Sequence, residues 1–211
     1  VSEILNQVLF VKKKIESNLN NIVFMGIGEP LDNYDNVVKA ICILNSKDAF
    51  NIGARKITIS TCGVIPAIKR LQERNWQIEL SVSLHAPENK LRSYLMPVNN
   101  MYPLPDLIEV CRNYAEKTKR QITFEYILIK GVNDSLIYAD KLAKLIGGFN
   151  SKVNLITFNT APDSLLRAPG ISQVKSFKNK LVARGIPATT RISKGDDISA
   201  ACGQLKSLHL R

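Results

Sequence analysis

Short apolar runs alternate with longer amphipathic segments along most of the chain. The runs are rich in β-branched residues, which is typical of buried strands, whereas the longer segments repeat apolar residues at helical spacing. The second such segment has Asp35 as a candidate N-cap. Strands are expected at residues 22–27, 56–60, 77–84, 122–130, 152–158 and 188–192. Helices are expected at residues 1–17, 34–46, 66–74, 104–116, 136–147 and 171–184, with a polar stretch at 86–101.

Strands that are separated by helices of this length predict parallel βαβ units, and the first helix is expected to cover the sheet. Six such units form either an open doubly wound sheet or an incomplete barrel, and periodicity does not decide between them. Polar residues recur where strands end, at Glu29, Ser60, His85, Asn159 and the segment after residue 192. Because the carboxyl ends of parallel strands share one edge, we expect a ligand site there.

The first strand ends in the turn GIGEP at residues 26–30. Its glycines let the backbone approach a ligand, Glu29 offers an anion to a cationic head group, and Pro30 stiffens the exit. The same sequence also fits an ordinary turn between a strand and a helix. A dinucleotide-binding fingerprint is excluded, because Leu31 stands where that motif needs its last glycine.

The chain has 211 residues, 45% of them hydrophobic, which is enough for one core, so we expect one domain or one large piece of a domain. Its net charge of +11 indicates a polyanionic partner, with RNA or DNA ahead of a membrane surface. The basic residues are scattered, with small clusters at 12–14 and 117–120. Each cluster alone also fits a solvated helix face, so any basic surface must be assembled by folding.

Four widely spaced cysteines form no C-x-x-C pair, which argues against a zinc site and a disulfide framework and favours a reducing cytosol. No signal peptide and no membrane-spanning run is present, so we expect a soluble, cytoplasmic protein. The first residue is Val, which indicates a chain that begins inside a longer protein.

Several motifs also have structural interpretations. The hydroxyls of residues 60–63 fit a turn that bonds the backbone, and His85 fits a structural role at a strand end as well as it fits catalysis. Near the C-terminus, Asp196 or Asp197 fits a helix cap, and Cys202 fits a small apolar residue.

Five motifs in a fixed order resemble the radical S-adenosylmethionine (SAM) RNA adenosine methyltransferases of the RlmN/Cfr type. They are MGIGEPL at 25–31, STCG at 60–63, SLHAP at 83–87, NLI followed by Asn at 154–159, and KGDDISAACGQL at 194–205. The last of these is the most specific. Residues 160–162 depart from the family's commoner Asn-Pro-x-Pro, which leaves the shape of that loop open.

The resemblance implies a partial (β/α)6 barrel of parallel strands and a methyl group carried on a cysteine. In this family the cysteine that corresponds to Cys202 receives the methyl group from SAM, which suits a thiolate nucleophile. The residues that the family uses to hold SAM correspond here to Gly28, Glu29, Ser60, Ser83, Leu84, His85 and Asn159.

One defining feature of the superfamily is absent, namely the C-x-x-x-C-x-x-C motif that binds a [4Fe–4S] cluster. We therefore expect residues 1–211 to be a radical SAM catalytic domain that is incomplete at its N-terminus, without the first barrel strand and the cluster loop. The chain itself is expected to contain no metal ligands, and the cluster is expected in the full-length protein.

The resemblance implies methylation of adenine C2 in 23S ribosomal RNA, and also in transfer RNA, by a monomer that uses two SAM molecules per product. One SAM methylates Cys202, and the other yields a 5′-deoxyadenosyl radical that activates the new S-methyl group. Two alternatives stay open at this point. One is methylation of adenine C8 by the same cysteine, and the other is a basic RNA-binding module without catalysis.

Overall fold

The computed structural model describes residues 1–15, 19–26, 28–159 and 165–191. These residues form one parallel sheet whose spatial order β1-β2-β3-β4-β5-β6 is the order of the sequence. The strands are β1 (Ile22–Phe24), β2 (Ile57–Thr61), β3 (Glu79–Ser83), β4 (Ile122–Leu128), β5 (Ser151–Thr157) and β6 (Ala188–Arg191). The helices are α1 (Ser2–Lys14), α2 (Tyr34–Asn45), α3 (Ile65–Glu73), α4 (Asn89–Leu95), α5 (Leu104–Thr118), α6 (Leu136–Ile146) and α7 (Ile171–Ala183).

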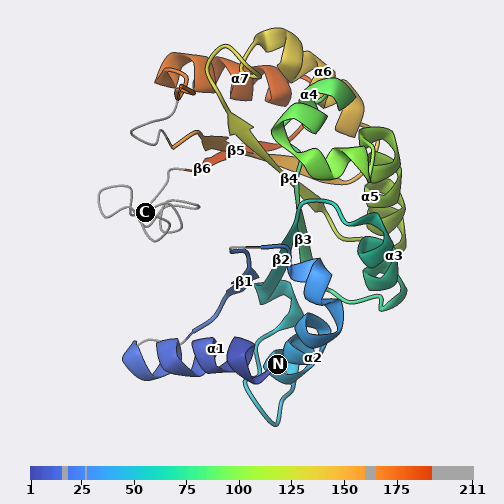
Figure 1. Ribbon diagram of the computed structural model, residues 1–211, viewed down its shortest axis with the longest axis vertical. Helices are drawn as coiled ribbons and strands as arrows, with labels where there is room; N and C mark the ends of the chain where they lie inside the picture. Colours follow the sequence, from blue (N-terminus) through green and yellow to red (C-terminus); the bar gives the residue numbers. More distant parts are fainter. Residues whose placement is uncertain (16–18, 27, 160–164, 192–211) are drawn as a thin grey trace.

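The sheet curves into an open arc, with helices on its convex side and β1 and β6 at its two ends (Figure 1). A doubly wound sheet would reverse its strand order and carry helices on both faces. The strand order here never reverses, so the fold is the incomplete barrel. This confirms the predicted α/β class with parallel strands.

Strand β4 shows how the two faces of the sheet differ. Phe124 and Tyr126 point to the helices, where they pack against Phe149 and against Phe177 of α7. The intervening Thr123 and Glu125 lie on the opposite, concave face, because side chains alternate along a strand. The hydrophobic core therefore lies between sheet and helices, and polar side chains line the inside of the arc.

Three sequence predictions were wrong in detail. Strand β1 ends at Phe24, because the chain folds back on itself through a bridge between Gly26 and Gly28. Helix α1 lies beside β1 and packs on α2; none of its residues is fully buried, although Ile4, Leu5 and Val8 pack against the core, so it covers the sheet only in part (Figure 1). Asp35 does not cap α2 but forms an exposed ion pair with Arg70 across 2.7 Å.

The polar stretch at 86–101 contains α4 and a short 3₁₀ turn, η3 (Pro97–Asn100). Its buried residues include Arg92 and Asn99, so the segment faces the interior with polar side chains. This explains why hydrophobic periodicity did not reveal the helix.

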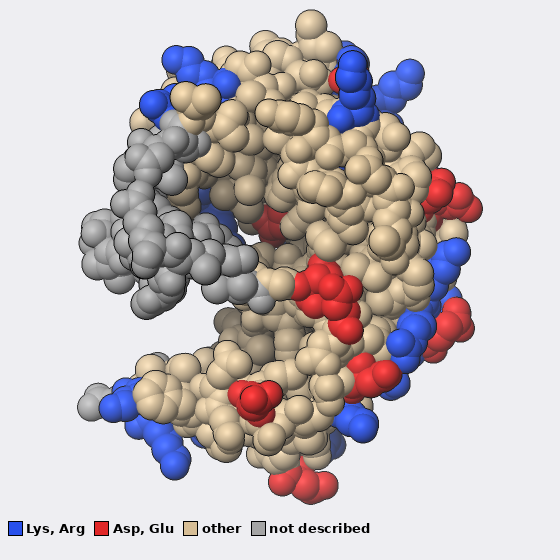
Figure 2. Space-filling model, viewed as in Figure 1, with Lys and Arg blue, Asp and Glu red and all other residues tan. Residues whose placement is uncertain are grey.

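Basic side chains are spread over the ends and the outer side of the arc on the face shown in Figure 2, and they form no single patch there. This agrees with their scattered positions in the sequence. No helix among the described residues has the length and the apolar character needed to cross a bilayer.

Candidate functional site

The turn after β1 is fixed by one glycine and one carboxylate. Gly28 has a φ of +102°, a region of backbone conformation that is essentially restricted to glycine. Glu29 then caps the 3₁₀ turn η1 (Pro30–Asn33), because its Oε1 accepts the Leu31 N–H at 2.9 Å. Its Oε2 accepts the Cys62 N–H at 2.6 Å, which joins this turn to the end of β2. Each oxygen keeps a second lone pair for a ligand.

Replacing Gly28 with alanine is expected to lower the free energy of unfolding by about 1–3 kcal/mol, because alanine is strained at this φ. Gly26→Ala is the matched control. No atom lies within 4 Å of the position of a new Cβ at either glycine, but only Gly28 has a positive φ. Urea denaturation of both variants measures the difference, and equal losses would contradict the backbone explanation.

The end of β2 brings Ser60 and Cys62 to the same edge of the sheet. Ser60 is buried, and the hydroxyl of the next residue, Thr61, accepts the Gly63 N–H at 3.0 Å. That bond confirms the turn interpretation for this hydroxyl. Burial, together with the Glu29 carboxylate beside it, raises the pKa of the Cys62 thiol to about 12. Cys62 is therefore a protonated thiol at neutral pH and neither a thiolate nucleophile nor a ready metal ligand.

The end of β3 is bonded to β4 by the backbone of Leu84 and His85. Both N–H groups donate to the Glu125 carbonyl, at 3.0 and 3.4 Å, while Ser83 precedes them at the last position of the strand. The buried Asn133 completes the link, since its amide donates to the carbonyls of His85 and Ile127 at 2.8 and 2.7 Å.

His85 has a left-handed backbone with φ +58°, and its ring is held in one protonation state. The Nδ1 atom accepts the Ile127 N–H at 3.2 Å, so that nitrogen is unprotonated. Burial and the positive charge of Arg92 lower the pKa of His85 to about 4. At neutral pH the ring is uncharged, and its Nε2–H has no hydrogen-bond partner among the described residues, so this donor is available to a ligand.

This low pKa predicts a pH dependence of stability. The unfolded chain binds a proton at His85 near pH 6.5 and the folded chain near pH 4, so the free energy of unfolding falls as pH falls through this window. The loss attributable to His85 is up to about 3 kcal/mol. His85→Asn tolerates the positive φ and does not titrate. Urea denaturation between pH 7 and 4 should give a smaller loss for this variant; equal losses would exclude His85 as the cause.

Arg92 of α4 is fully buried and joins the ends of two strands. Its Nη2 donates to the Cys62 carbonyl at 2.7 Å and the Ser83 carbonyl at 3.1 Å, and its Nη1 donates to Asn99 Oδ1 at 2.9 Å. Burial lowers the pKa of Arg92 to about 10, so the guanidinium stays charged at pH 7. It forms no ion pair with any described carboxylate.

Glu125 lies on the concave face, in register with Ser83 on one side and Asn154 on the other. Asn154 Nδ2 donates to Glu125 Oε2 at 2.9 Å, and the Thr189 hydroxyl donates to Asn154 Oδ1 at 3.1 Å. Burial raises the pKa of Glu125. A carboxyl group with altered acidity therefore lies at the level of Ser83, inside the arc.

Hydrogen bonds form a continuous path along the carboxyl edge of the sheet. The path runs from Glu29 to Cys62, then through Arg92 to Ser83 and through His85 to β4. It ends where the Phe158 N–H donates to the Leu128 carbonyl at 3.2 Å, one residue before the half-buried Asn159. All seven residues predicted to hold SAM thus lie at this edge, whereas Cys202 lies outside the described residues.

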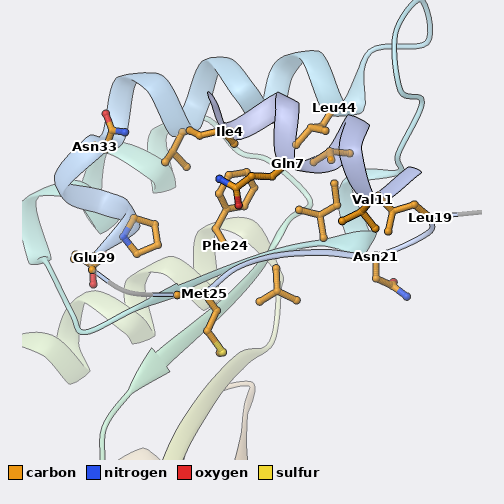
Figure 3. A pocket seen from close by; sticks show the side chains of 17 residues that line it. Ile4, Gln7, Val11, Leu19, Asn21, Phe24, Met25, Glu29, Asn33 and Leu44 are labelled. Atoms are coloured by element: carbon orange, nitrogen blue, oxygen red, sulfur yellow. The ribbon is translucent and has the colours of Figure 1, made fainter. Parts of the chain in front are cut away.

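A cavity of about 570 Å³ is centred elsewhere. It lies between α1, α2 and the edge strand β1, and is mainly apolar, with Phe24 and Met25 on its walls (Figure 3). Gly28 and Glu29 reach its rim, but Ser60, Ser83 and His85 do not line it. It therefore borders the predicted site at one end only.

The described cysteines do not fit an iron–sulfur cluster. Cys42 is exposed on α2, Cys62 follows β2, and Cys111 is fully buried in α5. Burial raises the pKa of Cys111 to about 12, as it does for Cys62, so both thiols are protonated. No described group of three or more His, Cys, Asp or Glu residues is arranged for a metal ion. These residues provide no basis for a reaction step through a cluster.

An incomplete parallel barrel with polar groups at the carboxyl edge of its strands defines a class of proteins. The family model described as the radical SAM superfamily matches residues 2–142, and the chain belongs to that superfamily. The curated relatives of the chain have a more specific description. Proteins described as "Probable dual-specificity RNA methyltransferase RlmN" from Clostridium novyi and Clostridium tetani are 46% and 44% identical to it over 209 residues. These alignments cover 99% of this chain and 61% and 60% of the relatives, so the chain spans about three fifths of their length.

Solved structures agree with this assignment. A radical SAM methyltransferase from Sphaerobacter thermophilus is 47% identical with a TM-score of 0.88, over 92% of this chain and 57% of that one. A domain of a pyruvate-formate lyase-activating enzyme from Bacteroides vulgatus has a TM-score of 0.60 at 15% identity, over 82% of this chain and 100% of that one, and shares the fold alone. The family resemblance seen in the motifs is confirmed.

Sequence reasoning missed three residues of this edge, which are Arg92, Glu125 and Asn133. Arg92 was hidden in a polar stretch and Asn133 in a turn. Glu125 carried a signal, since an acidic residue inside an otherwise apolar strand is a buried charge that needs a reason.

Proposed function

We propose that the whole protein containing this chain is a radical SAM RNA methyltransferase that methylates adenine C2 in 23S ribosomal RNA and in transfer RNA, in the cytoplasm and as a monomer. Residues 1–211 are its catalytic domain, incomplete at the N-terminus. The observation that carries the proposal is the continuous bonded edge from Glu29 to Phe158, which links four of the five family motifs. The RlmN-type relatives, at 44–47% identity, support the choice of substrate.

The chain's own residues suit the binding of SAM. The uncharged His85 offers an Nε2–H donor, Glu29 offers an anion for the methionine ammonium, and Ser60 and Ser83 offer hydroxyls on the same edge. Gly28 has no side chain, so the ligand can approach its backbone closely. Arg92 acts as a positioning residue, because it fixes the carbonyls at the ends of β2 and β3 without facing the ligand.

Cys202 accepts the methyl group in this proposal. Its thiolate attacks the methyl carbon of SAM, the bond from that carbon to the sulfonium sulfur breaks, and S-adenosylhomocysteine leaves as the neutral thioether. The methyl group then sits on the cysteine sulfur. The chemistry that carries it on to adenine requires the [4Fe–4S] cluster of the superfamily, whose ligands we place outside the residues described here.

Mass spectrometry of nucleosides tests the proposal. The whole protein, reconstituted anaerobically with iron and sulfide, is incubated with SAM, a reductant and unmodified 23S ribosomal RNA or transfer RNA. We expect 2-methyladenosine from both RNAs. Formation of 8-methyladenosine would instead identify the C8 enzyme, and RNA binding without any methylated nucleoside would favour a non-catalytic module.

A further inference from the structure

A second cavity opens at the opposite, amino-terminal end of the strands. It has a volume of about 440 Å³ and lies among the first residues of β2, β3, β4 and β5 and the segment that follows α5. Cavities that hold small ligands typically measure about 300–1,000 Å³. None of the predicted SAM residues lines it, although one of them, Ser60, pairs in register with the lining residue Ser81.

The floor of this cavity is made of hydroxyl groups on adjacent strands. Ser81 of β3 pairs in register with Thr123 of β4, and both line the cavity. The two residues are only 5% and 9% exposed, yet neither hydroxyl has a hydrogen-bond partner in the part of the chain that the structure describes. The hydroxyls of two buried residues therefore face a cavity and not a protein acceptor or donor.

Positive charge surrounds these hydroxyls. Lys152 of β5 is half-buried and pairs in register with Thr123, and Arg55 and Lys119 stand on the rim. None of these three cations forms an ion pair with a described carboxylate. Glu125 lies two residues after Thr123 on the same face of β4. The charge of Lys152 acts to lower the pKa of the Glu125 carboxyl, although the two groups form no ion pair.

The remaining cation is only partly neutralised. Arg120 forms an ion pair with Glu79, the one carboxylate among the lining residues, but the buried Nε of Arg120 has no hydrogen-bond partner among the described residues. A desolvated N–H without an acceptor is unfavourable, and so is a half-buried ammonium that forms no ion pair. An oxyanion in the cavity would offer acceptors to the Lys152 ammonium and to the two hydroxyls.

We propose that this cavity binds a phosphate group, with Lys152 and Arg120 as charged donors and Ser81 and Thr123 as neutral donors. Phosphate oxygens accept several hydrogen bonds at once and carry the charge that four cations against one carboxylate favour. The group belongs either to a free phosphate compound such as pyrophosphate or to the backbone of an RNA. This site goes beyond the proposed methyl transfer and does not depend on it.

Titration calorimetry of the 211-residue chain with sodium pyrophosphate tests the site. We expect saturable binding with one site per chain. Lys152→Met, which removes the charge and keeps the stem, should weaken it about tenfold or more, and Thr123→Val by a smaller factor. Lys175→Met removes the same charge from an exposed position on α7 and should leave the affinity unchanged.

A second measurement covers the case in which a variant fails to fold. Amide NMR shifts of the unmodified chain should move at Ser81, Thr123 and Lys152 when pyrophosphate is added. A ten-nucleotide RNA that displaces pyrophosphate would identify an RNA phosphate as the ligand, and failure to displace it would identify a free phosphate compound. No binding at millimolar pyrophosphate, shifts confined to other residues, or an equal effect of Lys175→Met would overturn the proposal.

Discussion

Replacing Cys202 with alanine should abolish RNA methylation by the whole protein. Alanine has no nucleophile, so in the proposed reaction SAM has no acceptor on the protein and no methyl group reaches the position from which adenine would receive it. The expected loss exceeds that of any contact residue, because the side chain takes part in bond making. Nucleoside mass spectrometry measures it. A companion measurement on the intact enzyme should find one added methyl group in the peptide that carries Cys202.

Cys42→Ala is the matched control for this substitution. Cys42 is exposed on α2 and makes no contact with the carboxyl edge in the described structure, so its removal should leave methylation unchanged. Turnover by Cys202→Ala at the normal rate would show that another group accepts the methyl group. Loss of activity in both variants would point to general damage by cysteine replacement.

Replacing Arg92 with alanine should lower the free energy of unfolding by about 3–5 kcal/mol, the largest stability effect that we expect. The substitution removes three charge-assisted hydrogen bonds and leaves Asn99 and two strand-end carbonyls short of donors. It also leaves space in a closely packed region. Urea denaturation at pH 7 measures the change.

Arg74→Ala provides the comparison. That arginine is exposed and its guanidinium lies over the face of Trp76, at 5.0 Å, so its loss should cost under about 1 kcal/mol. Arg92→Ala should also raise the pKa of His85, since a repelling charge is removed. An NMR titration that finds the His85 pKa unchanged would contradict this coupling, even if the protein were destabilised.

Sequence periodicity predicted the six strands and six of the helices to within a few residues, because most of them bury an apolar face against the other layer. Periodicity failed where the buried side chains are polar. Helix α4 carries the fully buried Arg92, so the segment that closes one side of the site read as a loop. Strand β1 was predicted too long, because the turn at Gly28 depends on backbone geometry that composition does not reveal.

The site was predicted unevenly for the same reason. The positions of Ser60, His85 and Asn159 at strand ends followed from topology, since parallel strands end at one edge. The partners of these residues did not follow, because they come from distant segments. Cys62 bonds Glu29 across 33 positions of sequence, and Asn133 bonds the His85 carbonyl across 48. Such pairings depend on the folded geometry, and no local pattern encodes them.

The strand order of the sheet also affects how the chain folds during synthesis. Each strand pairs with the one made just before it, so a strand that leaves the ribosome meets a neighbour that is already present. We expect the arc to grow from β1 towards β6 as translation proceeds, without waiting for the last residues. Pulse proteolysis of ribosome-bound chains of increasing length would show stepwise protection, and protection that arises only at full length would contradict this order.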